Sequence, residues 1–306
     1  MTKLLQTLVD GISVGSLYAL IALGYTMVYG ILSFINFAHS DVFMLGAWIS
    51  LALSQALGWA DVAPPAWAIA VVLPAAMVLC AVIGFTIERL AYRPLRAAPR
   101  LNVLITAIGV SLLLENSGAL PFLFGTQPQS MPRLIADRPL ATIAGVNINV
   151  VDVVVVVVAV TLMTLLQWLV FGTKLGRAMR AVSFSDKIAA LMGVNVNLVI
   201  SFTFVVGSAL AAAAGLLYAM KYPGIKQPAD ASWVLLGLKA FCAAVVGGIG
   251  NVRGAMLGGL LIGLVELFGA AYVSTTLRDA YVFLVLIAVL LGRPSGILGR
   301  AVVEKV

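Results

Sequence analysis

The sequence has little charge. Only 10% of its 306 residues are Asp, Glu, Lys or Arg, whereas 62% are hydrophobic. A soluble domain carries roughly 25% charged residues, so this composition excludes an ordinary soluble fold. The mean hydropathy of +1.10 agrees with that exclusion. Apolar windows of about 17 to 25 residues recur along the chain, which is the length a helix needs to cross a bilayer. We therefore predict an all-α, polytopic membrane protein.

Residues that carry chemistry are also scarce. Cysteine occurs twice and histidine once. Cys80 and Cys242 lie in separate apolar windows, so we expect unpaired packing residues and no redox centre. His39 has no Cys or carboxylate cluster at ligand spacing, which does not favour a metal site. No G-x-x-x-x-G-K-[ST] phosphate loop and no Ser, His and acid grouping occur, so we expect neither an ATP site nor a hydrolase.

Nine apolar windows are candidates for membrane helices. They cover residues 5–31, 41–57, 66–88, 101–124, 149–171, 198–220, 232–250, 254–273 and 279–292. We expect about eight transmembrane helices in a single domain spanning 1–306, because some windows could be re-entrant. If the first two windows both cross, parity places the N-terminus outside; if one is re-entrant, it lies inside. The first window is too long for a cleavable signal peptide.

Basic residues outnumber acidic ones by 19 to 12, and they are clustered. The clusters are Arg89, Arg93, Arg96 and Arg100; Lys174, Arg177, Arg180 and Lys187; and Arg293, Arg300 and Lys305. The positive-inside rule places all three in the cytoplasm. Short loops between membrane helices are a poor setting for nucleic-acid binding. The loop 125–147 then lies outside, and its segment "ATIAGVNI" could form a small hairpin.

A polar interlude, "GTKLGRAMRAVSFSDKIAALMGVNVNLVI" (172–200), separates two apolar windows. Ser185 or Asp186 suits a helix N-cap and Gly193 suits the position after a helix end, so we predict a short amphipathic helix at the cytoplasmic surface. One interpretation is a coupling helix that docks on a motor subunit, within a coupling loop of about 172–197. Its candidate residues are Arg177, Arg180, Lys187, Ala189, Ala190 and Gly193. The other interpretation is an ordinary positive-inside connector.

Polar residues inside the apolar windows are candidates for a translocation path, because charge at membrane depth is costly. They are Asn36, His39, Asp41, Glu115, Lys239 and Glu266. Around His39, a discontinuous helix and a plain turn at the cytoplasmic surface explain the sequence equally well. For Lys239 we expect a side chain that reaches toward an interface; an ion pair with Glu266 or Glu115 is the alternative. Glu266 is expected to point into the bundle, for packing or for transport.

Glycines recur in the window that contains Glu266. Gly254, Gly258, Gly259 and Gly263 are candidates for close helix packing, because small residues let neighbouring backbones approach. The stretch could suggest a dinucleotide-binding loop, but no strand precedes it within the membrane windows. Close packing is the preferred interpretation.

Several passages resemble the permease subunits of bacterial branched-chain amino acid ABC importers. They are "GSLYALIALGYTMVYGILSFINFAH" (15–39), "IERLAYRPLR" (87–96), "KAFCAAVVGGIG" (239–250), "GAMLGGLLIGLVE" (254–266) and "RPSGILGR" (293–300). In the interlude, "KIAALMGVN" stands where importer permeases carry Ala-Ala followed by Gly. Two departures stand out. Lys187 and Ile188 replace the Glu of the general pattern, and Ser40 and Asp41 replace the Gly and Glu that usually follow the His.

The resemblance implies the smaller permease subunit of a high-affinity importer in the bacterial inner membrane, which carries branched-chain or related neutral amino acids. In that family the subunit works in the bilayer with a second, homologous permease, two cytoplasmic ATPases and a periplasmic amino-acid-binding protein. ATP is then bound by partner subunits, so we expect no enzyme activity and no cofactor in this chain. The alternative is a self-contained, ion-coupled transporter with Glu115, Lys239 and Glu266 as a relay. It would need an inverted repeat, which the sequence lacks.

Overall fold

A computed structural model describes residues 2–32, 34–59, 64–65, 67–96, 98–136, 138–143 and 145–299. Arg300 and Lys305 of the predicted basic tail lie outside these residues. The helices are α1 (Thr2–Leu32), α2 (His39–Ala56), α3 (Ala68–Ile87), α4 (Arg100–Gly118), α5 (Val150–Gly172), α6 (Lys174–Phe184), α7 (Asp186–Leu191), α8 (Val196–Lys221), α9 (Ala231–Gly247), α10 (Val252–Tyr272) and α11 (Arg278–Gly292). A π-helical turn (Glu88–Tyr92) and a 3-10 turn (Arg93–Leu95) extend α3.

Each of the nine apolar windows coincides with a helix, which confirms the all-α, polytopic prediction. Among the described residues, six helices are long and apolar enough to cross a membrane: α1, α3 with its extension, α4, α5, α8 and α10. The other three are shorter, with 18 residues in α2, 17 in α9 and 15 in α11. The window 101–124 is longer than its helix, because α4 ends at Gly118 and a turn follows around Pro121.

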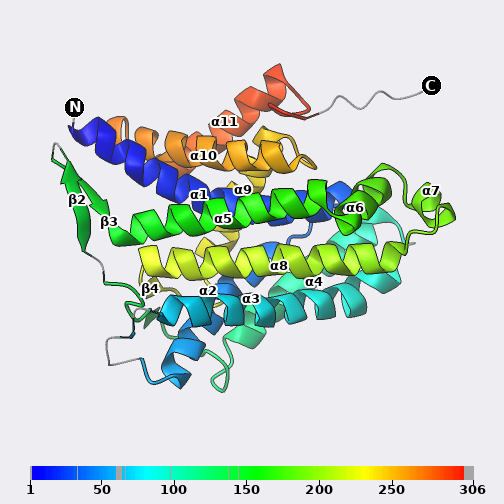
Figure 1. Cartoon of the computed structure of the whole chain (residues 1–306), viewed down its shortest axis with the longest axis horizontal. Helices are drawn as coiled ribbons and strands as arrows, with labels where there is room; N and C mark the ends of the chain where they lie inside the picture. The colour runs from blue at the N-terminus through cyan, green and yellow to red at the C-terminus, as the bar shows by residue number, and fades with distance from the viewer. Residues whose placement is uncertain are drawn as a thin grey trace.

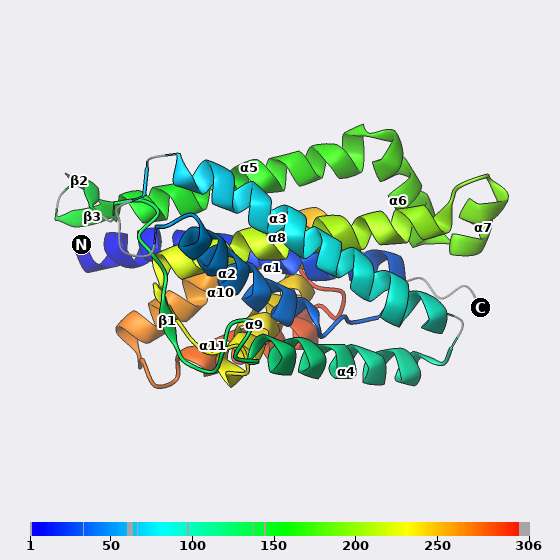
Figure 2. The same cartoon turned by 90° about the horizontal axis from the view of Figure 1, so that it is seen from below.

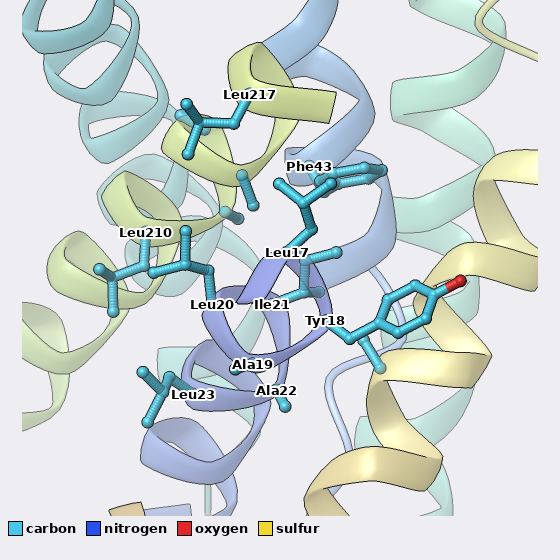
Figure 3. Packing of buried hydrophobic residues seen from close by; sticks show 14 of the residues in the cluster. Leu17, Tyr18, Ala19, Leu20, Ile21, Ala22, Leu23, Phe43, Leu210 and Leu217 are labelled. Carbon is cyan, nitrogen blue, oxygen red and sulfur yellow. The ribbon is translucent and has the colours of Figure 1, made fainter. Parts of the chain in front are cut away.

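Helix α1 is the centre of the bundle and packs against α5, α8, α9 and α10. Its segment from Val14 to Val28 is buried without interruption. Figure 3 shows Leu20 and Leu23 facing α8, while Tyr18 points its hydroxyl away from that aliphatic cluster. A helix that is apolar on all sides and buried on all sides is expected at the core of a membrane bundle. Helices α3, α4 and α5 instead leave most of their apolar surface uncovered, as lipid-facing helices do.

Close contact between α1 and α10 depends on glycine. A methyl group built at Gly259 would lie 2.4 Å from the backbone of Ala19, and one at Gly263 would lie 2.3 Å from Gly15 Cα. Gly258 and Gly254 face the end of α9 in the same way, at 2.1 Å from Ala243 O and 2.3 Å from Gly247 O. All four predicted packing glycines therefore lie against backbone, and no larger residue fits without displacing a helix.

The two ends of the molecule differ in charge. Helices α6 and α7 lie at one end, and the start of α1 lies at the other with strands β2 (Pro139–Ile143) and β3 (Val146–Asn149) (Figure 1). Arg96 donates to Asn197 at the start of α8 over 2.6 Å, which brings the basic ends of α3 and α6–α7 together. By the positive-inside rule this end faces the cytoplasm.

The opposite end then lies outside, and the start of α1 belongs to it. Gln6 donates to the carbonyl of Asn147 in β3 over 3.2 Å. Helix α1 therefore crosses completely, which resolves the orientation that parity left open. Strands β2 and β3 form the predicted hairpin. Strand β1 (Gln129–Ser130) pairs with β4 (Gly224–Ile225) and joins two outer loops.

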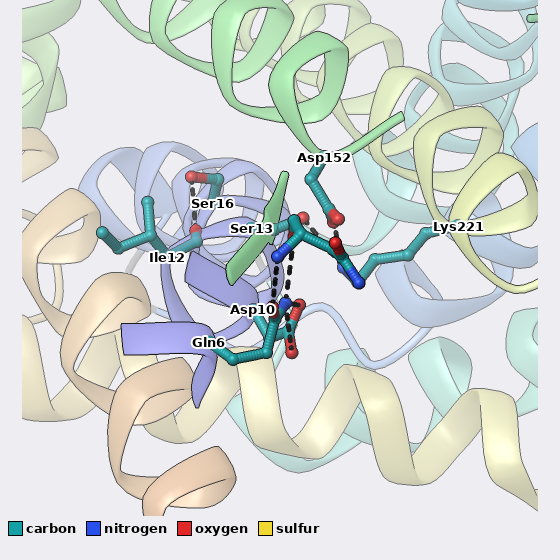
Figure 4. Close-up of polar contacts among 8 residues, drawn as sticks. Gln6, Asp10, Ile12, Ser13, Ser16, Asp152 and Lys221 are labelled. Atoms are coloured by element: carbon teal, nitrogen blue, oxygen red, sulfur yellow. Dashed lines mark hydrogen bonds and ion pairs between the residues drawn. The ribbon is translucent and has the colours of Figure 1, made fainter. Parts of the chain in front are cut away.

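A polar cluster ties three helices together at the outer end. Lys221 at the end of α8 forms an ion pair with Asp152 in the first turn of α5 and donates to Ser13 of α1 over 3.1 Å (Figure 4). Asp10 and Gln6 lie about one and two turns closer to the start of α1, respectively, as Figure 4 shows. The aliphatic stem of Lys221 follows the apolar helix while its ammonium group reaches this outer cluster.

Helix α2 begins inside the bundle. The His39 ring packs edge-on against Tyr25 with 4.7 Å between ring centroids, and a methyl group at Gly24 would lie 2.2 Å from His39 Nε2. Helix α1 continues for eight residues beyond Gly24, or about 12 Å at 1.5 Å per residue. The chain thus re-enters the bundle before α2 starts, and the interpretation as a plain surface turn is wrong.

Candidate coupling and translocation sites

The interlude forms two helices where one was predicted. The hydroxyl of Thr173 accepts from the Gly176 N–H over 3.0 Å and caps α6, and Ser185 accepts from the Ile188 N–H over 3.3 Å and caps α7. We call the pair, Lys174–Leu191, the lever. Two residues after the lever, Gly193 has a φ of +82° and turns the chain toward α8. The prediction of a short helix between Ser185 and Gly193 describes α7, and it misses α6.

The lever exposes large apolar side chains where the chain leaves the membrane. Phe184 and Leu191 are each 87% exposed and Met192 is 80% exposed. A group of bare apolar side chains on a basic segment is typical of a surface that another protein covers. Figure 1 shows α7 projecting beyond the ends of the neighbouring helices.

The candidate coupling residues do not share one environment. Arg177, Lys187 and Ala190 are exposed, whereas Ala189 is buried inside the chain at 3% exposure. Only Ala190 of the alanine pair can therefore touch a partner. Arg180 folds back toward α5, where it donates to the Val170 carbonyl and lies 5.3 Å from the centre of the Phe171 ring. This contact joins α6 to α5, while the Arg180 side chain remains exposed on the lever.

Side-chain hydrogen bonds join α8, next to the lever, to the end of α3. Asn195 caps α8 by accepting from the Leu198 N–H over 3.1 Å. In the next turn, Ser201 donates to Glu88 Oε2 over 2.6 Å. Glu88 is fully buried at the start of the π-helical turn, and its other oxygen pairs with Arg96. Burial lowers the pKa of the Arg96 guanidinium, and Glu88 opposes that shift.

The same π-helical turn contacts the segment just before α2, which lies inside the bundle. Tyr92, the last residue of the π-helical turn, donates from its hydroxyl to Asn36 Oδ1 over 2.6 Å. π-helical turns are rare and occur mostly at functional positions. Hydrogen bonds therefore connect α8, next to the lever, with the segment where α2 begins inside the bundle.

Asp41 lies in the first turn of α2, where a carboxylate suits the positive end of the helix dipole. It is fully buried and accepts from the Ser111 hydroxyl on α4 over 2.5 Å. Glu115 lies one turn further along α4, near the outer end of that helix. Helix α4 runs along one edge of the molecule and packs on α2 and the π-helical turn (Figure 2). Asn36, His39, Asp41 and Glu115 are thus gathered around the start of α2.

Lys239 and Glu266 belong to a separate cluster. Lys239 Nζ lies 2.9 Å from Glu266 Oε1 and 2.5 Å from Asp279 Oδ1, and Arg278 Nε lies 2.6 Å from Glu266 Oε1. Lys239 is only 4% exposed, so the expectation that it reaches toward an interface is wrong, and the alternative of an ion pair with Glu266 is confirmed. A buried ammonium requires paired carboxylates, and α10 and α11 supply them.

Sequence reasoning missed Arg278 and Asp279. They are adjacent charges at the start of an apolar window, and that position was the available signal. The members proposed for the alternative ion relay do not lie together. Lys239 pairs with Glu266 and Asp279 on α10 and α11, whereas Glu115 lies on α4 beside the start of α2.

A cavity of about 440 Å³ lies above this cluster at the outer end of the bundle. Its lining includes the charged residues Lys239, Glu266, Arg278 and Asp279 and the apolar residues Leu17, Trp233 and Leu236. Lys226, Thr275 and Thr276 from outer loops also line it, so it opens outward. Asp230 at the start of α9 accepts from the Ser232 N–H over 2.9 Å, and hydrogen bonds from Ser232 lower the pKa of its carboxyl group. No group of three metal-ligating side chains gathers in the part of the chain that the structure describes.

Comparison with known proteins gives a consistent result over nearly the whole chain. The family model for the branched-chain amino acid transport system permease component matches residues 7–290. The chain belongs to this permease family. The high-affinity branched-chain amino acid transport system permease protein BraD of Pseudomonas aeruginosa is 43% identical over 99% of this chain and 98% of its own length. Its counterpart LivH of Escherichia coli K12 is 41% identical over 99% and 97%.

One solved structure also resembles this permease. PsaBC from Streptococcus pneumoniae, solved in complex with Fab, covers 94% of this chain and 89% of its own, with 16% identity and a TM-score of 0.46. A likeness at that level carries no argument about mechanism. The matched region, residues 7–290, contains the lever, the start of α2 and the Lys239 cluster of the permease.

Proposed function

We propose that this permease forms half of the translocation path of an ABC importer for branched-chain amino acids or related neutral amino acids. The chain is a multi-pass protein of the bacterial inner membrane. Relatives that share more than 40% of its residues over nearly the full length are permease proteins of branched-chain amino acid transport systems. The sequence offers no phosphate loop, so ATP would be bound and hydrolysed by separate subunits.

The lever is the observation that supports this function most strongly. It lies at the basic end of the molecule, and it presents Phe184 and Leu191 without any covering residue. We propose that an ATPase subunit covers these side chains and moves the lever. Hydrogen bonds through Ser201, Glu88 and Tyr92 would carry that movement to the start of α2.

The proposed assembly contains a second, homologous permease, two ATPase subunits on the cytoplasmic side, and a periplasmic amino-acid-binding protein. The hairpin of β2 and β3 and the paired loops of β1 and β4 lie at the outer end and would meet the binding protein. Asp41 and Glu115 would line the path between the two permeases, because Asp41 accepts from Ser111 of α4 at one edge of the bundle and Glu115 lies one turn further along that helix. Asn36 and His39, which are buried against Tyr92 and Gly24, would hold the start of α2 beside that path.

Reconstitution tests this proposal. Proteoliposomes that contain the full assembly should take up radiolabelled L-leucine when ATP is supplied to the ATPase side, and omission of the ATPase subunits should abolish uptake. Leu191→Arg should reduce both uptake and co-purification of the ATPase, because it places a charge in the covered apolar surface. Leu140→Arg is the matched control for co-purification of the ATPase, which it should leave unchanged, since Leu140 is 61% exposed on the outer hairpin, away from the ATPase side. Uptake that persists without ATPase subunits would contradict the proposal.

A further inference from the structure

The cavity above the Lys239 cluster has the chemistry of a binding site for a zwitterion. Four charged side chains of one cluster line it: two basic, Lys239 and Arg278, and two acidic, Glu266 and Asp279. Their charges cancel, and Lys226, which also lines the cavity, pairs with Asp230 over 3.6 Å, so the cavity attracts neither a simple anion nor a simple cation over long range. A ligand with separated positive and negative groups can pair with both kinds of side chain at once.

Lys239 is already satisfied, whereas its neighbours are not. The Lys239 ammonium group is held by both carboxylates and is 5% exposed. Arg278 contacts Glu266 through Nε, and its side chain remains 40% exposed. Asp279 is 49% exposed beyond its contact with Lys239. Adjacent residues at the start of α11 therefore present one cationic and one anionic group to the cavity.

Arg278 and Asp279 supply the charged groups that a ligand in the cavity can reach. Glu266 is fully buried, where Lys239 and Arg278 contact its Oε1 and the Tyr18 hydroxyl lies beside its carboxylate, so it holds the cluster together. The ammonium group of a bound molecule would pair with the exposed carboxylate of Asp279, and its carboxylate would pair with the planar guanidinium of Arg278.

The apolar lining of the cavity is suited to an aliphatic side chain. Val14, Leu17, Trp233, Leu235 and Leu236 line it, with Tyr18, Tyr218 and Tyr222. Its volume of about 440 Å³ lies within the range of small-molecule sites. Such sites have predominantly apolar walls and a few polar groups that fix the orientation of the ligand.

The geometry points to an amino-acid-binding site in this cavity, within a single permease subunit and at its outer end. The ligand would be a zwitterionic aliphatic amino acid, with its carboxylate on Arg278, its ammonium group on Asp279, and its side chain against Leu17 and Leu236. This inference rests on the proposed function for the class of ligand. It adds a receiving site inside one subunit, separate from the residues around the start of α2.

Binding to the purified full chain in lipid nanodiscs tests the inference without partner subunits. Tritiated L-leucine should bind saturably with a Kd of about 1 mM or tighter. Leucinamide, which lacks the carboxylate, and 4-methylpentanoate, which lacks the ammonium group, should each compete about tenfold less well or worse. Competition by 4-methylpentanoate equal to that of L-leucine would overturn the zwitterion assignment.

Variants locate the site. Arg278→Gln should weaken L-leucine binding about tenfold or more, because it removes a charge-assisted contact. Leu236→Trp should also block binding by filling the cavity, and it decides the matter if Arg278→Gln does not fold. Arg293→Gln is the matched control, since Arg293 is exposed at the cytoplasmic end of α11.

Two results would overturn the inference while leaving the proposed function intact. One is unchanged L-leucine binding in both Arg278→Gln and Leu236→Trp. The other is no saturable binding to the chain when the full assembly made from it takes up L-leucine. Failure of uptake by the full assembly would instead contradict the proposed function, so the two failures are distinguishable.

Discussion

Gly193 shows how a single residue can fix the exit from the lever. Its φ is +82°, and a methyl group built on it meets nothing within 4 Å. Substitution therefore changes only the backbone preference, since left-handed geometry costs an L-residue about 1–2 kcal/mol. We predict that Gly193→Val lowers ATP-driven uptake severalfold, because α7 would no longer hold its angle to α8. Uptake by the reconstituted assembly measures this.

Gly109 provides the control for that prediction. It also has open space around it, but it lies within α4 at an ordinary helical φ. Gly109→Val should leave uptake nearly unchanged. Equal effects of the two substitutions would show that added bulk, and not backbone geometry, accounts for the loss at Gly193.

The ion pair between Lys239 and Glu266 gives a second prediction. Both side chains are buried, so removing one partner leaves the other as an uncompensated charge, at a cost of about 3–5 kcal/mol. We predict that Lys239→Met lowers the thermal unfolding midpoint of the purified protein markedly. The double variant Lys239→Met with Glu266→Gln should recover part of the loss, because the two effects are coupled. Additive losses would indicate that the two residues are energetically independent.

Local chemistry made some residues predictable and others not. Ser185 and Gly193 were identified because caps and left-handed turns require particular residue types within a few positions of the helix end. The partner of Lys239 is 27 residues away on another helix. Its choice depends on how α9, α10 and α11 pack, and a single sequence does not contain that information. The interpretation of Lys239 was wrong for this reason.

At the scale of elements, α1 and α10 approach closely along their glycines. We predict that Gly259→Leu destabilises the bundle by about 1–3 kcal/mol or more, because the new side chain would overlap the backbone of Ala19. Gly292→Leu at the end of α11 is the control, since a methyl group there meets nothing within 4 Å. Thermal unfolding of both variants in detergent measures the difference. An unchanged midpoint in Gly259→Leu would mean that the two helices separate freely.

The contact between α8 and the π-helical turn is expected to carry the motion of the lever. Ser201→Ala removes the hydroxyl that donates to Glu88 and leaves the lever surface unchanged. We predict that this variant still co-purifies with the ATPase but transports several times more slowly for each ATP hydrolysed. Ser183→Ala is a comparison on α6, where the hydroxyl donates to the Gly30 carbonyl. If Ser201→Ala transports normally, the motion does not pass through Glu88.

At the scale of the whole molecule, composition and the positions of the charges predicted the membrane architecture. The nine apolar windows and the basic clusters were enough to predict a polytopic helical protein and the side on which its basic loops lie, but not the side of the N-terminus. The same window lengths could not distinguish a full crossing from a helix that begins inside the bundle. Helix α2 shows why: its start is set by the contact of His39 with Gly24 and Tyr25, which are distant in sequence. Helix α6 was missed because its polar surface resembles that of a loop.

The central claim is that the lever lies in the cytoplasm and is moved by an ATPase subunit. A photo-crosslinking amino acid placed at Leu191 in cells that produce the full assembly tests it most directly. Leu191 is 87% exposed, so the substitution should not disturb folding. The account predicts a covalent adduct with the ATPase subunit after irradiation. An adduct with the periplasmic binding protein, or with lipid alone, would contradict it.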